Sequence, residues 1–337
     1  MSSHKKNRIK GLVKFLLTVA ISGACLYFAA RKIEWQKLQE DLRALNPIFI
    51  LLAGGVGAIA MASRAFRWHL VLTRERSFAY STSFWATAIG YLANNILPAR
   101  AGEIIRSVVL GLGADIRKSL VLATALTERI LDAGILMVLA FVMMAFAPQL
   151  PETIRKSWLV LLPVIGGVLV LVFLAPLMQN FWLRLVSLLP VGERLREKIR
   201  GLLIGLMDGV RKFYHVRILV FFIFISVIIW LTDALGMMLI ARSLGSDLTI
   251  PQSMIFIAAL GFASSVPSTP GYVGVFQAIA VLLLPVFGVS AHRAFLIVSV
   301  FQIVLLLVTA AFGVPGWFIM QRRIGAAKLE KELAEEE

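Results

Sequence analysis

Two apolar segments of this chain are interrupted in the same way, and this pair restricts the possible folds more than any other feature. Residues 91–106 read YLANNILPARAGEIIR, and residues 261–276 read GFASSVPSTPGYVGVF. Both contain a proline followed four residues later by a glycine, at Pro98 and Gly102 and, 169 positions further on, at Pro267 and Gly271. A proline removes a backbone donor and breaks a helix. The apolar run before each proline is therefore too short to cross a bilayer.

A broken helix is tolerated at membrane depth only where protein or a water-filled cavity satisfies the freed backbone groups. We therefore predict that each interrupted segment is buried in a helical bundle, as a re-entrant hairpin or a broken helix around a polar cavity. Paired interruptions in the two halves of a membrane chain indicate the binding site of a transporter. The residues expected to shape the broken backbone are Pro98, Gly102, Pro267, Pro270, Gly271 and Gly274.

The chain has the composition of an integral membrane protein. Of its 337 residues, 59% are hydrophobic, and the mean hydropathy is +0.86, whereas soluble domains are less apolar. The net charge of +15 is carried by basic residues beside apolar spans. This pattern is typical of cytoplasmic loops and argues against a nucleic-acid partner.

Sequence motifs for cofactors and catalysis are absent. The single cysteine, Cys25, and the four scattered histidines show no metal-ligand spacing. The sequence contains no P-loop, no GxSxG motif and no GxGxxG motif that opens a Rossmann unit. We therefore expect no metal, no cofactor and no enzyme activity.

Six apolar runs are long enough to cross a membrane, at 11–30, 48–71, 120–146, 158–178, 218–241 and 293–320. The interrupted segments lie within 84–113 and 253–287. The predicted fold is therefore an all-α polytopic membrane protein with six full spans and two re-entrant or broken helical hairpins. In the basic region 179–217, apolar residues recur at helical spacing from Leu195 to Phe213, which predicts an amphipathic helix on the membrane surface.

The two halves of the chain follow the same order of two spans, an interrupted segment and another span. We predict an inverted-topology repeat whose interrupted segments enter from opposite sides and meet near the bilayer midplane. The positive-inside rule then places both termini in the cytoplasm, with the basic loop 31–46 as an exception outside. The predicted divisions are a cytoplasmic N-terminus (1–10), a first membrane repeat (11–147), a second membrane repeat (158–320) with a cytoplasmic amphipathic insertion (179–217), and a cytoplasmic tail (321–337).

Charged and amide residues in these segments are the candidate binding residues. Glu128 and Asp132 are four positions apart and share a helix face, with Arg129 beside them. Such groups have two open interpretations. They can be structural, as interfacial anchors or buried ion pairs, or they can face inward and bind a lipid headgroup. A guanidinium grips phosphate with a fork of donors. The candidates for headgroup binding are Arg64, Arg67, Asn94, Asn95, Arg100, Glu103, Arg106, Glu128, Arg129, Asp132 and Asp233.

Four short patterns occur in order along the chain. They are R-x-x-RW at 64–68, NNxLP-x-R-x-GE at 94–103, ER-x-x-D at 128–132 and P-x-x-PG-x-x-G at 267–274. Together they resemble the lysylphosphatidylglycerol synthase transmembrane-region family, the flippase-like membrane region of the bacterial multiple peptide resistance factor. Stand-alone inner-membrane members also exist, some of them associated with hopanoid synthesis. The resemblance covers residues 10–325.

The resemblance implies lipid translocation, and the chain departs from the family pattern in two places. Gln277 stands where the family commonly has a glutamate, which puts a carboxylate role there in doubt. The cytosolic aminoacyl-transferase domain of the fused proteins is absent, which argues against lysyl transfer by this chain. A separate lipid-synthesising enzyme is therefore a candidate partner.

The predicted function is that of a flippase in the bacterial inner membrane. It would move a lipid with a polar, phosphate-containing headgroup between leaflets, passively or by ion coupling. One alternative is a membrane-embedded enzyme acting on a polyprenyl or glycolipid substrate, with Glu103, Glu128 and Asp132 as acid and base groups. The other is a non-transporting partner of a lipid-synthesis complex. The sequence leaves the lipid, the direction of movement and the oligomeric state open.

Overall fold

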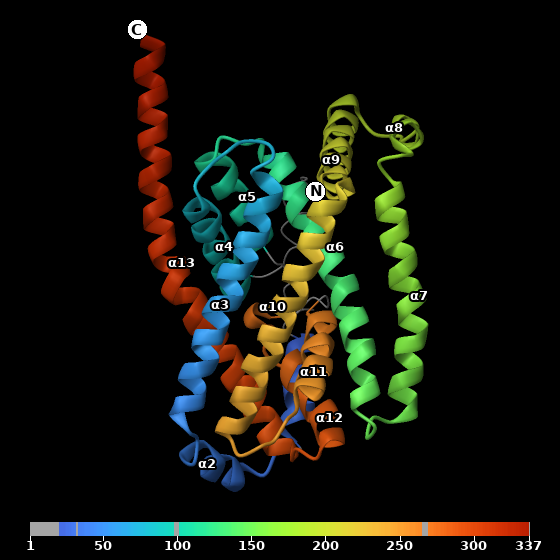
Figure 1. The fold of residues 1–337 in the computed structure, drawn as a ribbon, viewed down its shortest axis with the longest axis vertical. Coiled ribbons are helices and arrows are strands. Elements are labelled where there is room, and N and C mark those ends of the chain that lie inside the picture. Colours follow the sequence, from blue (N-terminus) through green and yellow to red (C-terminus); the bar gives the residue numbers. More distant parts are fainter. Residues whose placement is uncertain (1–19, 32, 98–100, 265–268, 337) are drawn as a thin grey trace, which may run out of the picture.

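The computed structural model describes residues 20–31, 33–97, 101–264 and 269–336, with side chains described up to residue 326. Across these residues the regular elements are all helices, which confirms the predicted all-α fold (Figure 1). The cytoplasmic N-terminus predicted at 1–10 and the first part of the span predicted at 11–30 lie outside the described residues. The described remainder of that span is the short apolar helix Ala20–Ala30.

Six helical segments of the described chain are long and apolar enough to cross a membrane. Five match predicted spans, and all six mark a multi-pass membrane protein. The matching segments are α3 (Pro47–Leu72), α6 (Lys118–Met143) with η2 (Met144–Phe146), α7 (Glu152–Leu174), α10 (Val216–Ser243) and the apolar part of α13 (Ala291–Glu336).

The sixth segment, Pro270–Phe287, falls within the second interrupted region and not among the predicted full spans. It is divided into η4 (Pro270–Tyr272), α12 (Val275–Leu283) and η5 (Leu284–Phe287). Gly271 and Gly274 have φ values of 68° and 90°, a left-handed conformation that interrupts a helix and favours glycine. The segment is therefore long and apolar, but it is not one continuous helix.

Each interrupted region contains a pair of short helices, which we call a hairpin, and the two hairpins lie toward opposite ends of the bundle (Figure 1). Entry of each hairpin from one side of a membrane stays a prediction. The first consists of α4 (Tyr80–Ile96) and α5 (Gly102–Gly113), and the second of α11 (Ile250–Ala263) followed by η4 and α12. α4 has 17 residues and α11 has 14, fewer than the about 20 that a full span needs. The symmetry between the two halves stays a prediction.

The hairpins are closely packed within themselves and against each other. A Cβ atom on Gly102 would collide with the carbonyl oxygen of Gly90, so α5 can approach α4 only because both positions lack a side chain. A Cβ atom on Gly271 would lie 3.6 Å from the carbonyl oxygen of Asn95. Gly271 of η4 therefore lies close to the C-terminal end of α4.

The remaining elements lie at the two ends of the bundle. α2 (Trp35–Arg43) lies at one end, and α8 (Gln179–Ser187), α9 (Glu193–Arg211) and the C-terminus lie at the other (Figure 1). α9 and η3 (Lys212–Tyr214) cover the predicted amphipathic region, and α9 packs on α6, where Gly209 contacts Ala123. Its position on the membrane surface and the cytoplasmic assignment of that end stay predictions.

Candidate functional site

A cavity of about 310 Å³ lies inside the bundle, between the two hairpins and the helices α3, α6, α10 and α13. Its volume is at the lower end of the range typical of ligand sites. Most of its wall is apolar, and the polar side chains that line it come from both halves of the chain. They are Arg64, Tyr91, Asn94, Asn95, Glu103, Arg129, Asp132, Thr232, Asp233, Ser264, Tyr272 and Thr309.

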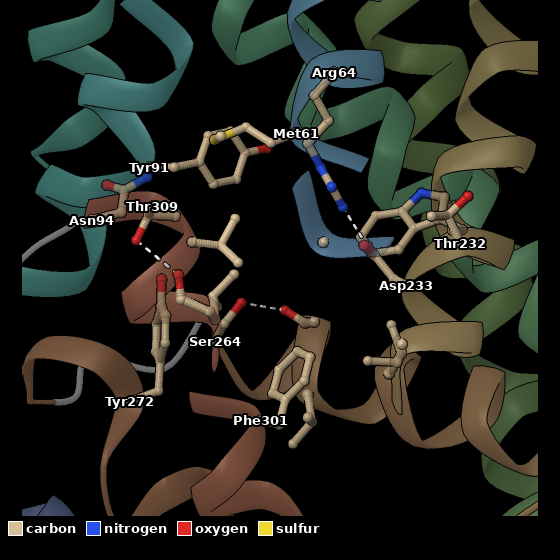
Figure 2. A pocket seen from close by; sticks show the side chains of 18 of the residues that line it. Met61, Arg64, Tyr91, Asn94, Thr232, Asp233, Ser264, Tyr272, Phe301 and Thr309 are labelled. Carbon is tan, nitrogen blue, oxygen red and sulfur yellow. Dashed lines mark hydrogen bonds and ion pairs between the residues drawn. The ribbon is translucent and has the colours of Figure 1, made fainter. Parts of the chain in front are cut away.

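One wall of the cavity carries an ion pair between Arg64 of α3 and Asp233 of α10, whose side chains are directed toward each other (Figure 2). Their exposed fractions are 14% and 19%, so the pair is accessible from the cavity. The Arg64 guanidinium also lies over the rings of Tyr91 and Trp230, at 5.7 and 5.8 Å. These aromatic faces stabilise the cation.

Arg67, one turn further along α3, is buried behind this wall with 1% of its side chain exposed. Its Nη1 and Nη2 atoms donate to the two carboxylate oxygens of Asp132 at 2.5 and 2.8 Å. Nη2 also donates to Glu128 at 2.9 Å, and Nη1 donates to Ser226 at 2.5 Å. A buried charge is tolerated when it is paired and hydrogen-bonded in this way. The arrangement fixes the relative positions of α3, α6 and α10.

A second group of charges connects the first hairpin to α6. Glu103, in the first turn of α5, lies 2.6 Å from Nε of Arg106 and 3.1 Å from Nε of Arg129. Arg129 also donates to the hydroxyl of Tyr91 at 2.8 Å. The Arg106 guanidinium stacks 4.5 Å from the ring of Trp68. A carboxylate at a helix N-terminus is favourable with the helix dipole, and here it also anchors the hairpin to its neighbours.

The charges of this polar network balance among the described residues. Four arginines (Arg64, Arg67, Arg106 and Arg129) face four carboxylates (Glu103, Glu128, Asp132 and Asp233). Because every carboxylate already contacts an arginine, a charged ligand can enter only by exchanging partners with an existing pair. Arg64, Arg129 and Asp233 are the members best placed for exchange, since they line the cavity and keep some exposure.

The two asparagines hold the tip of the first hairpin. Asn94 Oδ1 accepts a hydrogen bond from the backbone N–H of Gly102 at 2.9 Å, which satisfies one free donor at the start of α5. Asn95 Nδ2 donates to Thr309 of α13 at 3.0 Å. Both side chains also line the cavity, so the same residues shape the backbone and its polar surface.

A chain of amides holds the turn of the second hairpin. The Gln277 Oε1 atom accepts from the N–H of Gly274 at 2.7 Å, and its Nε2 atom donates to Gln302 at 2.6 Å. Gln302 in turn donates to the carbonyl of Gly271 at 2.7 Å. The position of Gln277 therefore uses both an acceptor and a donor. An ionised glutamate offers acceptors only, which explains why a glutamine suits this chain.

The structure divides the predicted binding residues into two groups. Seven line the cavity: Arg64, Asn94, Asn95, Glu103, Arg129, Asp132 and Asp233. Three are buried behind its wall: Arg67, Arg106 and Glu128. Arg100, Pro98 and Pro267 lie outside the described residues. Pro270, which begins η4, and Gly102, Gly271 and Gly274 shape the backbone at the hairpin turns. Binding of a headgroup by these residues stays a prediction.

Sequence reasoning missed the aromatic and hydroxyl groups of the cavity. Tyr91 opens the interrupted segment and contacts two arginines, and Trp230 lies three residues before Asp233. Their proximity to candidate charges along the chain could have suggested them. Thr309 and Tyr272 come from segments without a charged neighbour, and only the fold brings them to the cavity.

Comparison with known proteins identifies the family. The profile described as Lysylphosphatidylglycerol synthase TM region matches residues 15–313. The chain belongs to this family. The matched range includes both hairpins and all of the charged network.

Curated relatives of this family member include three archaeal proteins, each named a UPF0104 membrane protein. One from Methanocaldococcus jannaschii is 23% identical over 68% of this chain and 95% of its own length. Two from Methanothermobacter thermautotrophicus are 26% identical over 75% of this chain and 78% of the relative, and 24% identical over 83% and 87%. No solved structure matches the chain.

Proposed function

We propose that this protein is a lipid translocase, which moves a lipid with a polar, phosphate-containing headgroup between the two leaflets. The observation that supports this most is the ion pair of Arg64 and Asp233 in an internal cavity between hairpins that lie toward opposite ends of the bundle. Ionised side chains at membrane depth are costly and mark substrate pathways. Broken helices that meet at such a site are typical of transporters.

Polar side chains in the cavity can replace the water molecules that hydrate a lipid headgroup. Arg64 and Arg129 can turn from Asp233 and Glu103 toward a phosphate, which a guanidinium binds through two parallel hydrogen bonds. The released carboxylates can then accept hydrogen bonds from hydroxyl or ammonium groups of the same headgroup. Arg67 and Glu128 keep their own bonds and hold the helices in place. For a headgroup that also carries an ammonium group, exchange of partners keeps every charge paired, whereas a headgroup with hydroxyl groups alone leaves the released carboxylate hydrogen-bonded but without a cation.

The proposal also includes the orientation of the protein in its membrane and the energy source for lipid movement. The segments 64–76, 179–217 and 321–331, which are rich in basic residues, lie toward the end of the bundle that carries the C-terminus (Figure 1). The positive-inside rule favours that end as cytoplasmic, and we assign the protein to the bacterial inner membrane. Because the sequence has no nucleotide-binding motif, movement is passive or coupled to an ion.

The test is headgroup movement in proteoliposomes that contain the purified full chain. Fluorescent phosphatidylglycerol, an aminoacylated analogue and a polyprenyl phosphate are each placed in both leaflets, and the fraction reached by an outside quencher is followed. We expect the wild type to move at least one lipid and Asp233→Ala and Arg64→Ala to slow it. The control is Lys156→Ala, which breaks an exposed ion pair with Glu152 far from the cavity. Movement of no lipid by a folded wild type would overturn the proposal.

The same samples separate translocation from catalysis. After each assay the lipids are extracted and analysed by mass spectrometry. A translocase returns every lipid unchanged in mass. Conversion of a lipid by the wild type, lost in Glu103→Gln, would instead favour a membrane-embedded enzyme. Headgroup movement that is equal in the wild type, Arg64→Ala and Asp233→Ala would show that the charged cavity is not the pathway.

A further inference from the structure

A second recess, separate from the internal cavity, lies at the junction of α3, α6 and α9 and has a volume of about 480 Å³. The two linings share no residue. We call it the basic recess, because it contains four arginine or lysine side chains and only two acidic ones. They are Arg74, Arg117, Arg211 and Lys212, with Glu75 and Asp208.

The four cations come from three separate parts of the chain. Arg74 follows the end of α3, Arg117 precedes α6, and Arg211 and Lys212 lie where α9 meets η3. Their convergence is therefore a product of the fold and not of one basic run in the sequence. It creates a concentrated positive potential in a concave site.

Only half of this positive charge is compensated. Asp208 pairs with Arg211 at 3.1 Å, and Glu75 pairs with Lys212. The exposed side chains of Arg74 and Arg117 form no ion pair and no hydrogen bond with the residues that the structure describes. The six charged groups therefore carry a formal charge of +2, and the two guanidinium groups are free to bind a ligand.

Two further features make the empty recess electrostatically unfavourable. Burial lowers the pKa of Lys212, the positive charge of Arg74 lowers it further, and the contact with Glu75 does not offset this. Arg117 stands at the start of the 26-residue helix α6, whose N-terminus carries the positive end of the helix dipole and has no side-chain cap. A bound anion would offset both effects.

We infer that the basic recess binds a phosphate-bearing anion with two negative charges. Arg74 and Arg117 would supply forked donors to the phosphate oxygens, and the N-terminal end of the α6 dipole would add a favourable field for the anion. The charge of the ligand matches the formal charge of the recess. A phosphate group with two negative charges occurs both in the phosphomonoester headgroup of a lipid and in soluble phosphorylated compounds. This inference does not depend on the proposed translocase function.

Binding is measured with the full chain purified in a neutral detergent, by its thermal stabilisation and by titration. The soluble probe is inorganic phosphate, compared with chloride at the same ionic strength. The membrane probes are phosphatidylcholine vesicles with a minor fraction of phosphatidic acid, which is a phosphomonoester, or of phosphatidylglycerol, which is a phosphodiester. We expect the recess to prefer phosphomonoesters. Saturation by inorganic phosphate identifies a soluble source, and saturation by phosphatidic acid alone identifies a lipid.

The decisive variant is Arg74→Ala/Arg117→Ala, for which we expect a Kd about tenfold or more above that of the wild type, since charge-assisted bonds to phosphate are strong. The matched control is Arg184→Ala/Arg200→Ala, which removes two charges from another recess, between α8 and α9. It should leave the Kd unchanged. Arg74→Lys/Arg117→Lys keeps the positive charges but removes the paired N–H donors of the guanidinium groups, and it should give an intermediate Kd.

Two results would overturn the inference. One is the same loss of affinity in both double alanine variants, which would show a general attraction to a basic surface. The other is no saturable binding of inorganic phosphate or phosphatidic acid by the folded wild type. Each variant is compared by its elution volume and helical circular dichroism, so that misfolding is recognised before binding is measured.

Discussion

Arg64 and Asp233 form an ion pair although they are 169 positions apart, the same distance along the chain that separates the two interrupted segments. In a pair of repeats related by a two-fold axis, equivalent positions can touch each other only close to that axis. The internal repeat stays a prediction, and this contact is the place where its axis would pass. This place is also the wall of the cavity.

Variants that remove or swap the two charged side chains test the role of this ion pair. Arg64→Ala and Asp233→Ala each leave one charge without a partner, and we expect each to slow lipid movement by about tenfold or more, equivalent to about 1.4 kcal/mol or more. The double variant Arg64→Asp/Asp233→Arg restores a pair. It should unfold in detergent closer to the wild-type temperature than either single variant. Equal stability of all four proteins would show that the two side chains do not interact.

Replacement of Arg67 should affect stability more than any surface charge. Arg67→Met leaves Asp132 and Glu128 buried with fewer partners, and loss of one partner from a buried pair costs about 3–5 kcal/mol. We expect a clear fall in the unfolding temperature and in the yield of folded protein. Lys156→Ala, in an exposed pair, should change stability by less than about 1 kcal/mol. A fully stable Arg67→Met would contradict the structural role.

Two glycines provide a test of the first hairpin. Gly102→Ala places a Cβ atom against the carbonyl of Gly90 and the side chain of Asn94 and should open the hairpin. We expect lower thermal stability and slower lipid movement. Gly166→Ala in α7 meets no atom within 4 Å, and by helix propensity alone it should be neutral or stabilising by up to about 1 kcal/mol. Similar stability of the two variants would show that α4 and α5 are not closely packed.

The amide chain predicts the effect of restoring the family's common residue at position 277. Gln277→Glu keeps the acceptor for Gly274 but loses the donor to Gln302. A buried group left without its partner costs about 1–3 kcal/mol, so this variant should be less stable than the wild type. Gln277→Met, which removes both functions, should be less stable still. A more stable Gln277→Glu, measured by thermal unfolding in detergent, would show that the carboxylate finds another donor.

The sequence was sufficient for most of the helices, because apolar length and proline breaks are local properties. Long uninterrupted runs correctly predicted α3, α6, α7, α10 and α13. The segment Pro270–Phe287 was harder, since its length and composition suit a span while two glycines in left-handed conformations interrupt it. Only the backbone geometry shows this difference.

The candidate site could be predicted only in part for a different reason. The four-residue spacing placed Glu128 and Asp132 on one face, and both carboxylates contact Arg67. The sequence could not show that Arg64 reaches the cavity while Arg67 is buried behind it, because that depends on how α3 is rotated against α6 and α10. The contributions of Thr309 and Tyr272 depend on contacts between distant segments.

The distribution of the network over the chain has a consequence for biogenesis. α3 carries Arg64 and Arg67, and their partners lie in α6 and α10. During synthesis α3 therefore leaves the ribosome with two arginines in its second half that have no carboxylate to pair with, and unpaired charges within a membrane helix are costly. The pair of Arg64 can form only after 169 further residues have been made. Until then, the insertion machinery or water at the protein–lipid boundary must shelter these charges, and integration of α3 is completed by the second half of the protein.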